Sequence, residues 1–145
     1  MYRLNKKIKS HLSAAKVCAE LSYAERLKVG AVITKDDRLI SIGYNGTPTG
    51  FDNTCELHLD DSIKVTRPEV VHAEANAILF AAKHGLSTDG SMLVITHSPC
   101  YECAKMIVQC GIIEVYYEVE YRYKEPLVFL KECGVLVKKI GELND

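Results

Sequence analysis

The first part of the chain changes from a helical to an extended pattern of apolar positions. Residues 6–23 carry small and apolar side chains at helical spacing along one face, which predicts a helix. Residues 29–34 and 39–43 are apolar runs with the length of strands, and the charged segment 35–38 between them is typical of a tight turn. We therefore expect a β-hairpin after the first helix.

The second part of the chain begins with an irregular stretch, residues 44–69, which has no helical or strand pattern. A loop of this length in a small domain is more often functional than idle. After it the pattern alternates between helices and strands, and glycines mark the helix ends. The expected elements are helices at 72–84, 101–109 and 125–133 and strands at 92–96, 113–119 and 135–140.

This order of elements predicts the fold class. Alternating strands and helices are typical of an α/β protein with a mostly parallel sheet and helices on both faces, which makes three layers. The helix at 125–133 separates the fourth and fifth strands, so we expect those two strands to be parallel through a right-handed crossover. The first hairpin makes one edge pair antiparallel, and the five-stranded sheet is therefore mixed.

Composition bounds the partners and the compartment. The 145 residues are 48% hydrophobic, which suits one domain spanning residues 1–145. The net charge is −1 and no run of Lys or Arg exceeds two residues, so we expect no nucleic-acid partner. No apolar run approaches the roughly 20 residues that span a bilayer, so we expect no membrane partner. With no apolar signal segment at the N-terminus, we expect a cytoplasmic protein, in the host cytoplasm if the source is a virus.

Two short motifs carry the metal chemistry. His72 begins a predicted helix, and Cys100 and Cys103 lie three residues apart at the start of another, which places both thiols on one helical face. The positive ends of the two helices favour ionised thiolates. These three side chains are suitable ligands for Zn²⁺, and three protein ligands leave the fourth position open, as in catalytic zinc sites.

Glu74 supplies an acid–base group beside this site. It is two residues after His72, about 200° around the axis if both residues are helical, so the arrangement requires His72 at the very start of the helix. From there the carboxylate reaches a zinc-bound water and a substrate ring. His-x-Glu followed by Pro-Cys-x-x-Cys is the signature of zinc-dependent nucleobase deaminases, in which the glutamate shuttles protons.

Three other interpretations of these ligand residues remain open. A Cys-x-x-Cys between a strand and a helix is also typical of a thioredoxin-type redox pair, although His72 and Glu74 would then be idle. A structural zinc site needs a fourth ligand, which is not obvious. Cys55 and His58 in the irregular stretch are candidates to supply that ligand or to hold a second metal, but two ligands are too few for a separate site, so we expect no metal there.

With these residues in view, the chain resembles the deoxycytidylate (dCMP) deaminases of the cytidine deaminase superfamily. The resemblance implies a three-layer α/β/α cytidine deaminase-like fold. It also implies zinc-dependent hydrolysis of dCMP to dUMP and ammonia, which supplies dUMP for thymidylate synthesis. Four segments carry the resemblance, of which the Gly-Tyr-Asn-Gly-x-Pro loop favours the deoxycytidylate branch: residues 28–33, 43–50, 72–78 and 98–105.

The resemblance assigns roles around the pyrimidine and the sugar. His72, Cys100 and Cys103 would bind zinc and Glu74 would move protons. Asn45 would bind the deoxyribose 3′-hydroxyl, for which an amide offers both a donor and an acceptor. The alternative for Asn45 is a turn residue, because Asn-Gly is a turn signal.

The backbone around Ala73 and Ser98 would contact the pyrimidine edge in such an enzyme. Arg26 and Lys28, between the first helix and the first strand, are candidates to pair with the 5′-phosphate. Tyr121, after the fourth strand, would lie beside the base and phosphate, and Arg122 is a weaker candidate. The alternative for each of these side chains is an ordinary surface residue.

The resemblance also implies regulation and assembly. Members of this family are commonly homohexamers that dCTP with Mg²⁺ activates and dTTP inhibits. The effector site uses the loop in which Gly43, Gly46 and Pro48 lie here, and glycines let backbone amides approach phosphates closely. Residues 51–71 form a short segment without the His- and Cys-rich insertion of some relatives, which leaves a second zinc and the strength of regulation open.

Other functions compete with dCMP deamination. A deaminase of free cytidine is disfavoured by the helix predicted at 125–133, and a tRNA deaminase by the net charge of −1. Deamination of dCTP as well as dCMP stays open. A catalytically silent nucleotide sensor would not need Glu74, which is present.

Overall fold

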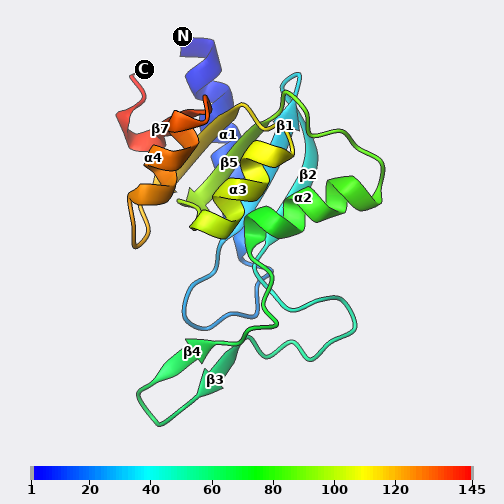
Figure 1. The fold of residues 1–145 in the computed structure, drawn as a ribbon, viewed down its shortest axis with the longest axis vertical. Helices are drawn as coiled ribbons and strands as arrows, with labels where there is room; N and C mark the ends of the chain where they lie inside the picture. Colours follow the sequence, from blue (N-terminus) through cyan, green and yellow to red (C-terminus); the bar gives the residue numbers. More distant parts are fainter. Residues whose placement is uncertain (1, 145) are drawn as a thin grey trace.

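The structure is a computed structural model that describes residues 2–144 (Figure 1). Its helices are α1 (Tyr2–Ala19), α2 (Ala73–Lys83), α3 (Tyr101–Gln109) and α4 (Glu125–Glu132), followed by a short 3₁₀ helix (Ile140–Glu142). Its strands are β1 (Gly30–Lys35), β2 (Arg38–Tyr44), β3 (Glu56–His58), β4 (Lys64–Thr66), β5 (Met92–His97), β6 (Glu114–Val119) and β7 (Leu136–Lys139).

The central sheet has five strands in the order β2-β1-β5-β6-β7. The β1–β2 hairpin is antiparallel, and β5–β6 and β6–β7 are parallel. These pairings confirm the mixed sheet and the parallel fourth and fifth strands. The expectation of a mostly parallel sheet was wrong, because β1 also pairs antiparallel with β5. The crossover from β2 through α2 passes over β1, so β5 lies beside the first strand of the hairpin.

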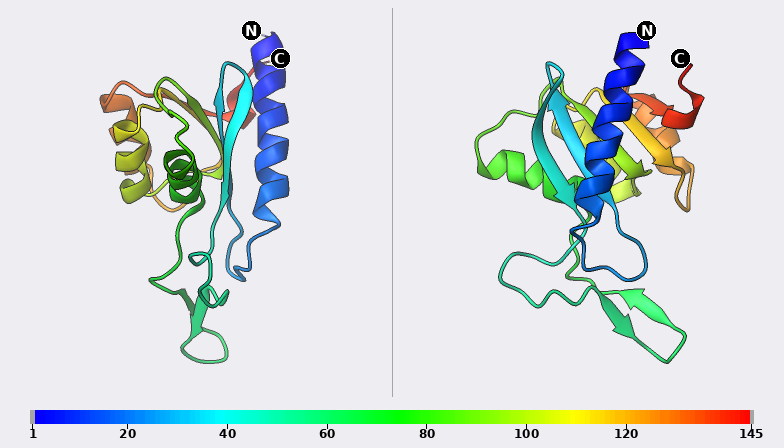
Figure 2. Two further views of the ribbon diagram at one scale, coloured as in Figure 1. Left: turned by 90° about the vertical axis from the view of Figure 1, so that its right-hand side faces the viewer. Right: turned by 180° about the vertical axis from the view of Figure 1, so that it is seen from behind.

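Helices cover both faces of the sheet, as predicted (Figure 2). One face of the sheet packs against α1, where Ile8, Leu12 and Ala15 meet Val32 and Val94. The other face packs against α2, α3 and α4 in a larger apolar cluster. Alternate side chains of each buried strand point to opposite faces, so both clusters draw on the same strands.

Close approach of α2 to the sheet depends on a glycine. A Cβ atom at Gly43 would lie 2.2 Å from the carbonyl oxygen of Ala73 and 2.6 Å from the backbone nitrogen of Ala77. Only glycine fits where backbone and strand meet so closely. This contact sets the first turn of α2 directly against β2, and that turn carries the candidate functional residues.

The stretch predicted to be irregular contains a second hairpin, made of β3 and β4. Figure 1 shows it projecting from the body of the molecule below the ends of α2 and α3. Each strand has three residues, too few for a recognisable alternation of apolar and polar positions. The first helix also ends earlier than predicted, at Ala19, where Ser22 begins a turn by accepting a hydrogen bond from the Ala24 N–H (3.1 Å).

Candidate metal centre and active-site pocket

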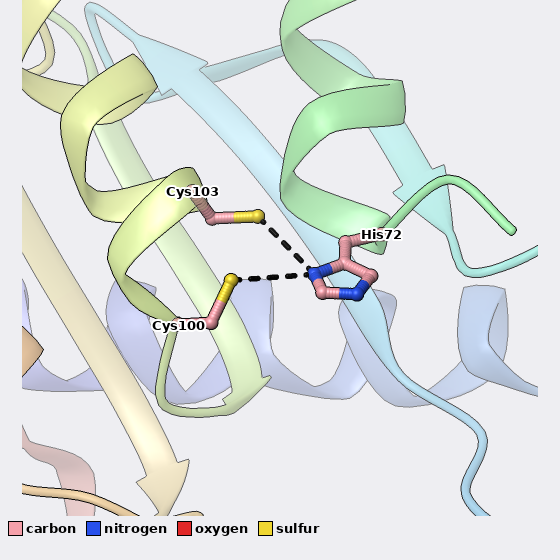
Figure 3. Close-up of side chains that lie close together, drawn as sticks. All are labelled: His72, Cys100 and Cys103. Carbon is pink, nitrogen blue, oxygen red and sulfur yellow. Dashed lines mark hydrogen bonds between the residues drawn. The ribbon is translucent and has the colours of Figure 1, made fainter. Parts of the chain in front are cut away.

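Two helix N-termini meet at the predicted metal site (Figure 3). His72 is the N-cap residue of α2 and Cys100 is the N-cap residue of α3, with Cys103 one turn further on. The Nδ1 atom of His72 lies 3.4 Å from Sγ of Cys100 and 3.5 Å from Sγ of Cys103. His72 has an extended backbone with ψ of 155°. It therefore stands at the very start of the helix, as the spacing to Glu74 required.

The three ligand atoms fit a zinc ion. They lie within 4.8 Å of one another. Zinc–sulfur bonds of about 2.3 Å and zinc–nitrogen bonds of about 2.0–2.1 Å at a tetrahedral angle separate sulfur from nitrogen by roughly 3.6 Å. The two sulfur–nitrogen distances of 3.4 and 3.5 Å are close to that value. Two thiols and an imidazole are also the soft donor set that zinc prefers.

One thiol of this cluster favours the ionised form. Hydrogen bonds from Cys103 and then His72 lower the pKa of the Cys100 thiol to about 3. The pKa of the Cys103 thiol is raised, first by that shared hydrogen bond and then by burial. The bond to Cys100 raises the pKa of His72. A thiolate at the start of a helix is therefore available to a cation near neutral pH.

Glu74 lies in the first turn of α2 and is 4% exposed. Burial is the largest influence on its carboxyl group and raises its pKa. The same residue lines the pocket that opens onto His72 and Cys100. A buried carboxyl group with a raised pKa beside a metal-binding cluster is a suitable general acid–base group.

The pocket has a volume of about 600 Å³. It brings together most of the side chains that the sequence singled out, which are Arg26, Asn45, His72, Ala73, Glu74, Ser98, Cys100 and Tyr121. The remaining predicted residues do not line it; they are Lys28, Cys103, Gly43, Gly46 and Pro48. Cys103 is buried beside the other two ligand residues, whereas Lys28 is exposed.

Asn45 and Ser98 hold the walls of the pocket. The Asn45 Oδ1 atom accepts a hydrogen bond from the Val29 N–H (2.9 Å), and its Nδ2 atom donates to the Leu27 carbonyl (2.8 Å). The Ser98 hydroxyl oxygen accepts a hydrogen bond from the Tyr121 N–H (2.7 Å). The structure thus gives Asn45 a loop-ordering contact that a turn residue alone would not have.

Three pocket-lining side chains contact one another: His97 at the end of β5, and Tyr121 and Arg122 after β6. The Arg122 guanidinium lies 5.0 Å from the centre of the Tyr121 ring, and the ring of His97 meets Tyr121 edge-on at 6.1 Å. Arg122 and His97 both line the pocket. From the sequence, Arg122 was only a weaker candidate for phosphate binding and His97 had no assigned role. Arg122 has a positive φ of 57°, a local conformation that no motif indicates.

Arg26 and Lys28 have different surroundings, although the sequence treated them alike. Arg26 lines the pocket and donates from its Nη1 atom to the Thr66 hydroxyl on β4 (3.0 Å). Lys28 does not line the pocket. The hairpin that the sequence missed contributes further lining residues, among them Glu56 and Val65.

The proposed effector residues lie along the end of β2 and the segment after it. Gly43 is buried against α2, which is a packing reason for glycine at this position. Gly46 forms an isolated β-bridge with Val71, with backbone hydrogen bonds of 3.1 and 2.8 Å. Pro48 is exposed.

Cys55 and His58 do not come together as a second metal site. The Cys55 thiol is buried and donates to the Asn53 carbonyl (3.4 Å). His58 lies 3.4 Å from a carboxylate oxygen of Glu25. Within residues 2–144, the only group of three or more metal-binding side chains close enough to share an ion is the His72 cluster.

The sequence contained no apolar run long enough to span a bilayer, and the helices of the structure can be compared with that expectation. Across the described part of the chain, the helices are all too short or too polar to cross a bilayer.

Comparison with known proteins connects this site to a family. A family model described as the cytidine and deoxycytidylate deaminase zinc-binding region matches residues 5–119. ComE operon protein 2 of Bacillus subtilis is 41% identical over 143 residues, which cover 94% of this chain and 69% of the relative. The deoxycytidylate deaminase of Mycobacterium phage D29 is 41% identical over 119 residues, which cover 75% of this chain and 91% of the relative.

A solved structure gives the same relationship in three dimensions. The crystal structure of dCMP deaminase from the cyanophage S-TIM5 in complex with dCMP and dUMP matches with a TM-score of 0.85 and 42% sequence identity. The match covers 90% of this chain and 94% of the phage chain.

Proposed function

The chain belongs to the cytidine and deoxycytidylate deaminase zinc-binding family and has its three-layer α/β/α fold, and we propose that it hydrolyses dCMP to dUMP and ammonia. The observation that carries the proposal is a single pocket lined by His72 and Cys100, by the buried residue Glu74, and by Arg26 and Arg122. Metal-binding, proton-transferring and anion-binding groups in one pocket suit a nucleotide whose base carries an amine.

His72, Cys100 and Cys103 would hold the zinc ion. When bound, zinc supplies a water molecule whose pKa is lowered to about 7. The two helix N-termini fix the positions of the three ligand side chains. The ligand atoms are thereby held at separations that suit the ion.

Glu74 moves the protons of the reaction. It takes a proton from the attacking water as the water oxygen bonds to the ring carbon that carries the amine. It gives this proton to the ring nitrogen, then takes a second proton from the hydroxyl group now on the ring carbon and gives it to the amine. The carbon–nitrogen bond breaks as the carbon–oxygen double bond forms, and ammonia leaves. The raised pKa of Glu74, caused mainly by burial, supports both halves of this role.

Arg26 and Arg122 would bind the 5′-phosphate through charge-assisted hydrogen bonds. They come from the loop before β1 and the loop after β6, so they approach the pocket from separate elements. Lys28 does not line the pocket, so this role does not extend to it. Tyr121, fixed between His97 and Arg122, would lie beside the base.

Asn45, Ala73 and Ser98 would contact the sugar and the pyrimidine edge. The Asn45 amide keeps one hydrogen of Nδ2 and one lone pair of Oδ1 beyond its two bonds to the loop, and these suit the 3′-hydroxyl. Ala73 and Ser98 line the pocket, and their backbone would discriminate cytosine by its amine.

We also infer regulation and assembly of the family kind. In this proposal dCTP with Mg²⁺ activates a homohexamer, dTTP inhibits it, and the product dUMP supplies thymidylate synthesis in the cytoplasm. The support is the resemblance of residues 43–50 to the effector loop, with Gly46 and Pro48 on the part that follows β2. Leu79 and Phe80, which are 55% and 47% exposed on α2, are available for subunit packing.

A deamination assay on zinc-loaded protein tests the proposal. The assay compares dCMP with dCTP, cytidine and deoxycytidine, each with and without dCTP–Mg²⁺ or dTTP as effector. We expect dCMP to be the preferred substrate, with turnover that rises with dCTP and falls with dTTP. Turnover of deoxycytidine but not dCMP would overturn the phosphate assignment, and zinc-bound protein that deaminates none of them would favour a nucleotide sensor.

A further inference from the structure

A buried carboxylate on the projecting hairpin has no part in the reaction described above. Glu56 is the first residue of β3 and is 4% exposed. Its Oε1 atom accepts hydrogen bonds from two consecutive backbone N–H groups of the loop before β1, those of Glu25 (2.9 Å) and Arg26 (3.2 Å). Hydrogen bonds to an ionised acceptor are stronger than neutral ones, so this contact fixes the local path of the loop.

Exposed contacts join the same loop to the same hairpin. The Glu25 carboxylate lies 2.9 Å from the Lys64 ammonium and 3.4 Å from the ring of His58, and all three side chains are about half exposed. Ion pairs in water contribute little, because solvent screens them and the side chains lose freedom. Glu56 is therefore the principal attachment between the hairpin and the backbone of the loop.

The attached segment is a wall of the active-site pocket. Arg26 and Leu27 of the loop and Val65 and Thr66 of β4 all line the pocket, as does Glu56 itself. The Arg26 side chain also donates to the Thr66 hydroxyl at 3.0 Å. The carboxylate thus holds the backbone of Arg26, and the hydroxyl holds its side chain, from two strands of one hairpin.

We propose that Glu56 is a positioning residue for nucleotide binding: it holds Arg26 where the guanidinium meets the phosphate of the substrate. This inference rests on the proposed deamination of dCMP. It gives the projecting hairpin a function, since the hairpin carries the group that shapes the phosphate end of the pocket.

A double-mutant cycle on dCMP turnover tests whether Glu56 acts through Arg26. Glu56→Ala and Arg26→Ala are each expected to raise KM for dCMP by about 10-fold with kcat little changed, the loss typical of a hydrogen bond to a charged group. Because both changes remove the same interaction, the double variant should have the KM of Arg26→Ala alone. Independent, multiplying effects on KM would overturn the proposal, as would an unchanged KM for Glu56→Ala.

Two further variants separate positioning from simple loss of structure. Glu56→Gln keeps an oxygen acceptor and should restore most of the wild-type KM. Glu56→Asp keeps the charge but is shorter, so it should raise KM even if Glu56→Ala fails to fold. A Gln variant as impaired as the Ala variant would contradict the hydrogen-bond mechanism.

Asp60→Ala is the matched control. The Asp60 carboxylate also accepts hydrogen bonds from two backbone N–H groups, of Ser62 (2.7 Å) and Ile63 (2.9 Å), but these lie at the exposed tip of the same hairpin. This variant should keep the wild-type KM. An equal rise in KM would show that any damage to the hairpin has the same effect.

Hydrogen exchange provides a readout that does not depend on activity. Glu56→Ala should speed exchange at the amides of Glu25 and Arg26 and leave the amides of the central sheet protected. Unchanged exchange at these two amides would refute the proposal. If wild-type protein fails to deaminate dCMP while the two amides respond as expected, the proposed function fails and the attachment by Glu56 stands.

Discussion

Replacing Glu74 with glutamine changes the proton chemistry of the pocket and little else. The two side chains have nearly the same shape, so the first turn of α2 keeps its packing against Gly43. Glu74 is not one of the three clustered ligand groups, so zinc binding should be retained. Glutamine neither takes a proton from water nor delivers one to the ring nitrogen or the amine.

The size of the loss follows from burial. Glu74 is 4% exposed, so bulk water has little access to take over the proton transfers. General acid–base groups contribute about 10²–10⁴-fold to a rate. We therefore expect kcat for dCMP to fall by that factor, equivalent to roughly 2.7–5.4 kcal/mol in the activation free energy. The loss should appear in kcat, because glutamine still fills the site and leaves the phosphate contacts in place.

The assay measures dCMP turnover and zinc content on the same preparations. Glu102→Gln is the control, because Glu102 is an exposed residue of α3 that pairs with Lys105 on the surface, and it should keep wild-type kcat. A Glu74→Gln variant that binds zinc and turns dCMP over within a factor of about 10 of wild type would refute the proton-transfer role, since general acid–base catalysis contributes more than that.

Three further predictions concern the walls of the pocket. In steady-state kinetics Arg26→Ala should raise KM for dCMP by about 10-fold, whereas Lys28→Ala should leave it unchanged; equal effects would contradict the different surroundings of the two cations. Asn45→Ala should lower kcat/KM for dCMP by a factor equivalent to about 1–3 kcal/mol of activation free energy, because its hydrogen bonds are lost. An unchanged kcat/KM would remove Asn45 from the substrate site. Gly43→Ala should lower the free energy of unfolding in urea by about 1–3 kcal/mol, because a Cβ atom overpacks the contact with Ala73; an unchanged midpoint would argue against that contact.

The metal-binding side chains and their helices were predictable from sequence because their chemistry and their local geometry coincide. Ligands at the starts of two helices fix where those helices begin, and the structure places His72 and Cys100 at the two N-caps. The parallel pairing of β6 with β7 followed from the helix between them.

The position of β1 in the sheet could not be predicted in the same way. The hairpin pattern predicts that β1 and β2 pair, but either strand could then lie beside β5. The choice depends on how the crossover through α2 packs, which is a tertiary property. The structure places β1 between β2 and β5, and this adds the second antiparallel pairing.

The outer wall of the pocket was largely hidden in the sequence. Strands of three residues give too short a pattern to recognise, and Glu56 bonds to N–H groups about thirty positions away along the chain. Arg26 and Lys28 are alike in type and near in sequence, so only the loop path separates their roles. Arg122 lines the pocket with a positive φ, a backbone conformation that its residue type does not predict.

The central claim is that one zinc ion at His72, Cys100 and Cys103 serves the deamination of dCMP, and a zinc titration tests it most directly. Metal-free protein would receive increasing zinc while bound zinc and dUMP formation are measured together. The account predicts that turnover rises in proportion to bound zinc and levels off at one zinc per chain. Full turnover without zinc, or one tightly bound zinc per chain with no dUMP formed, would contradict it.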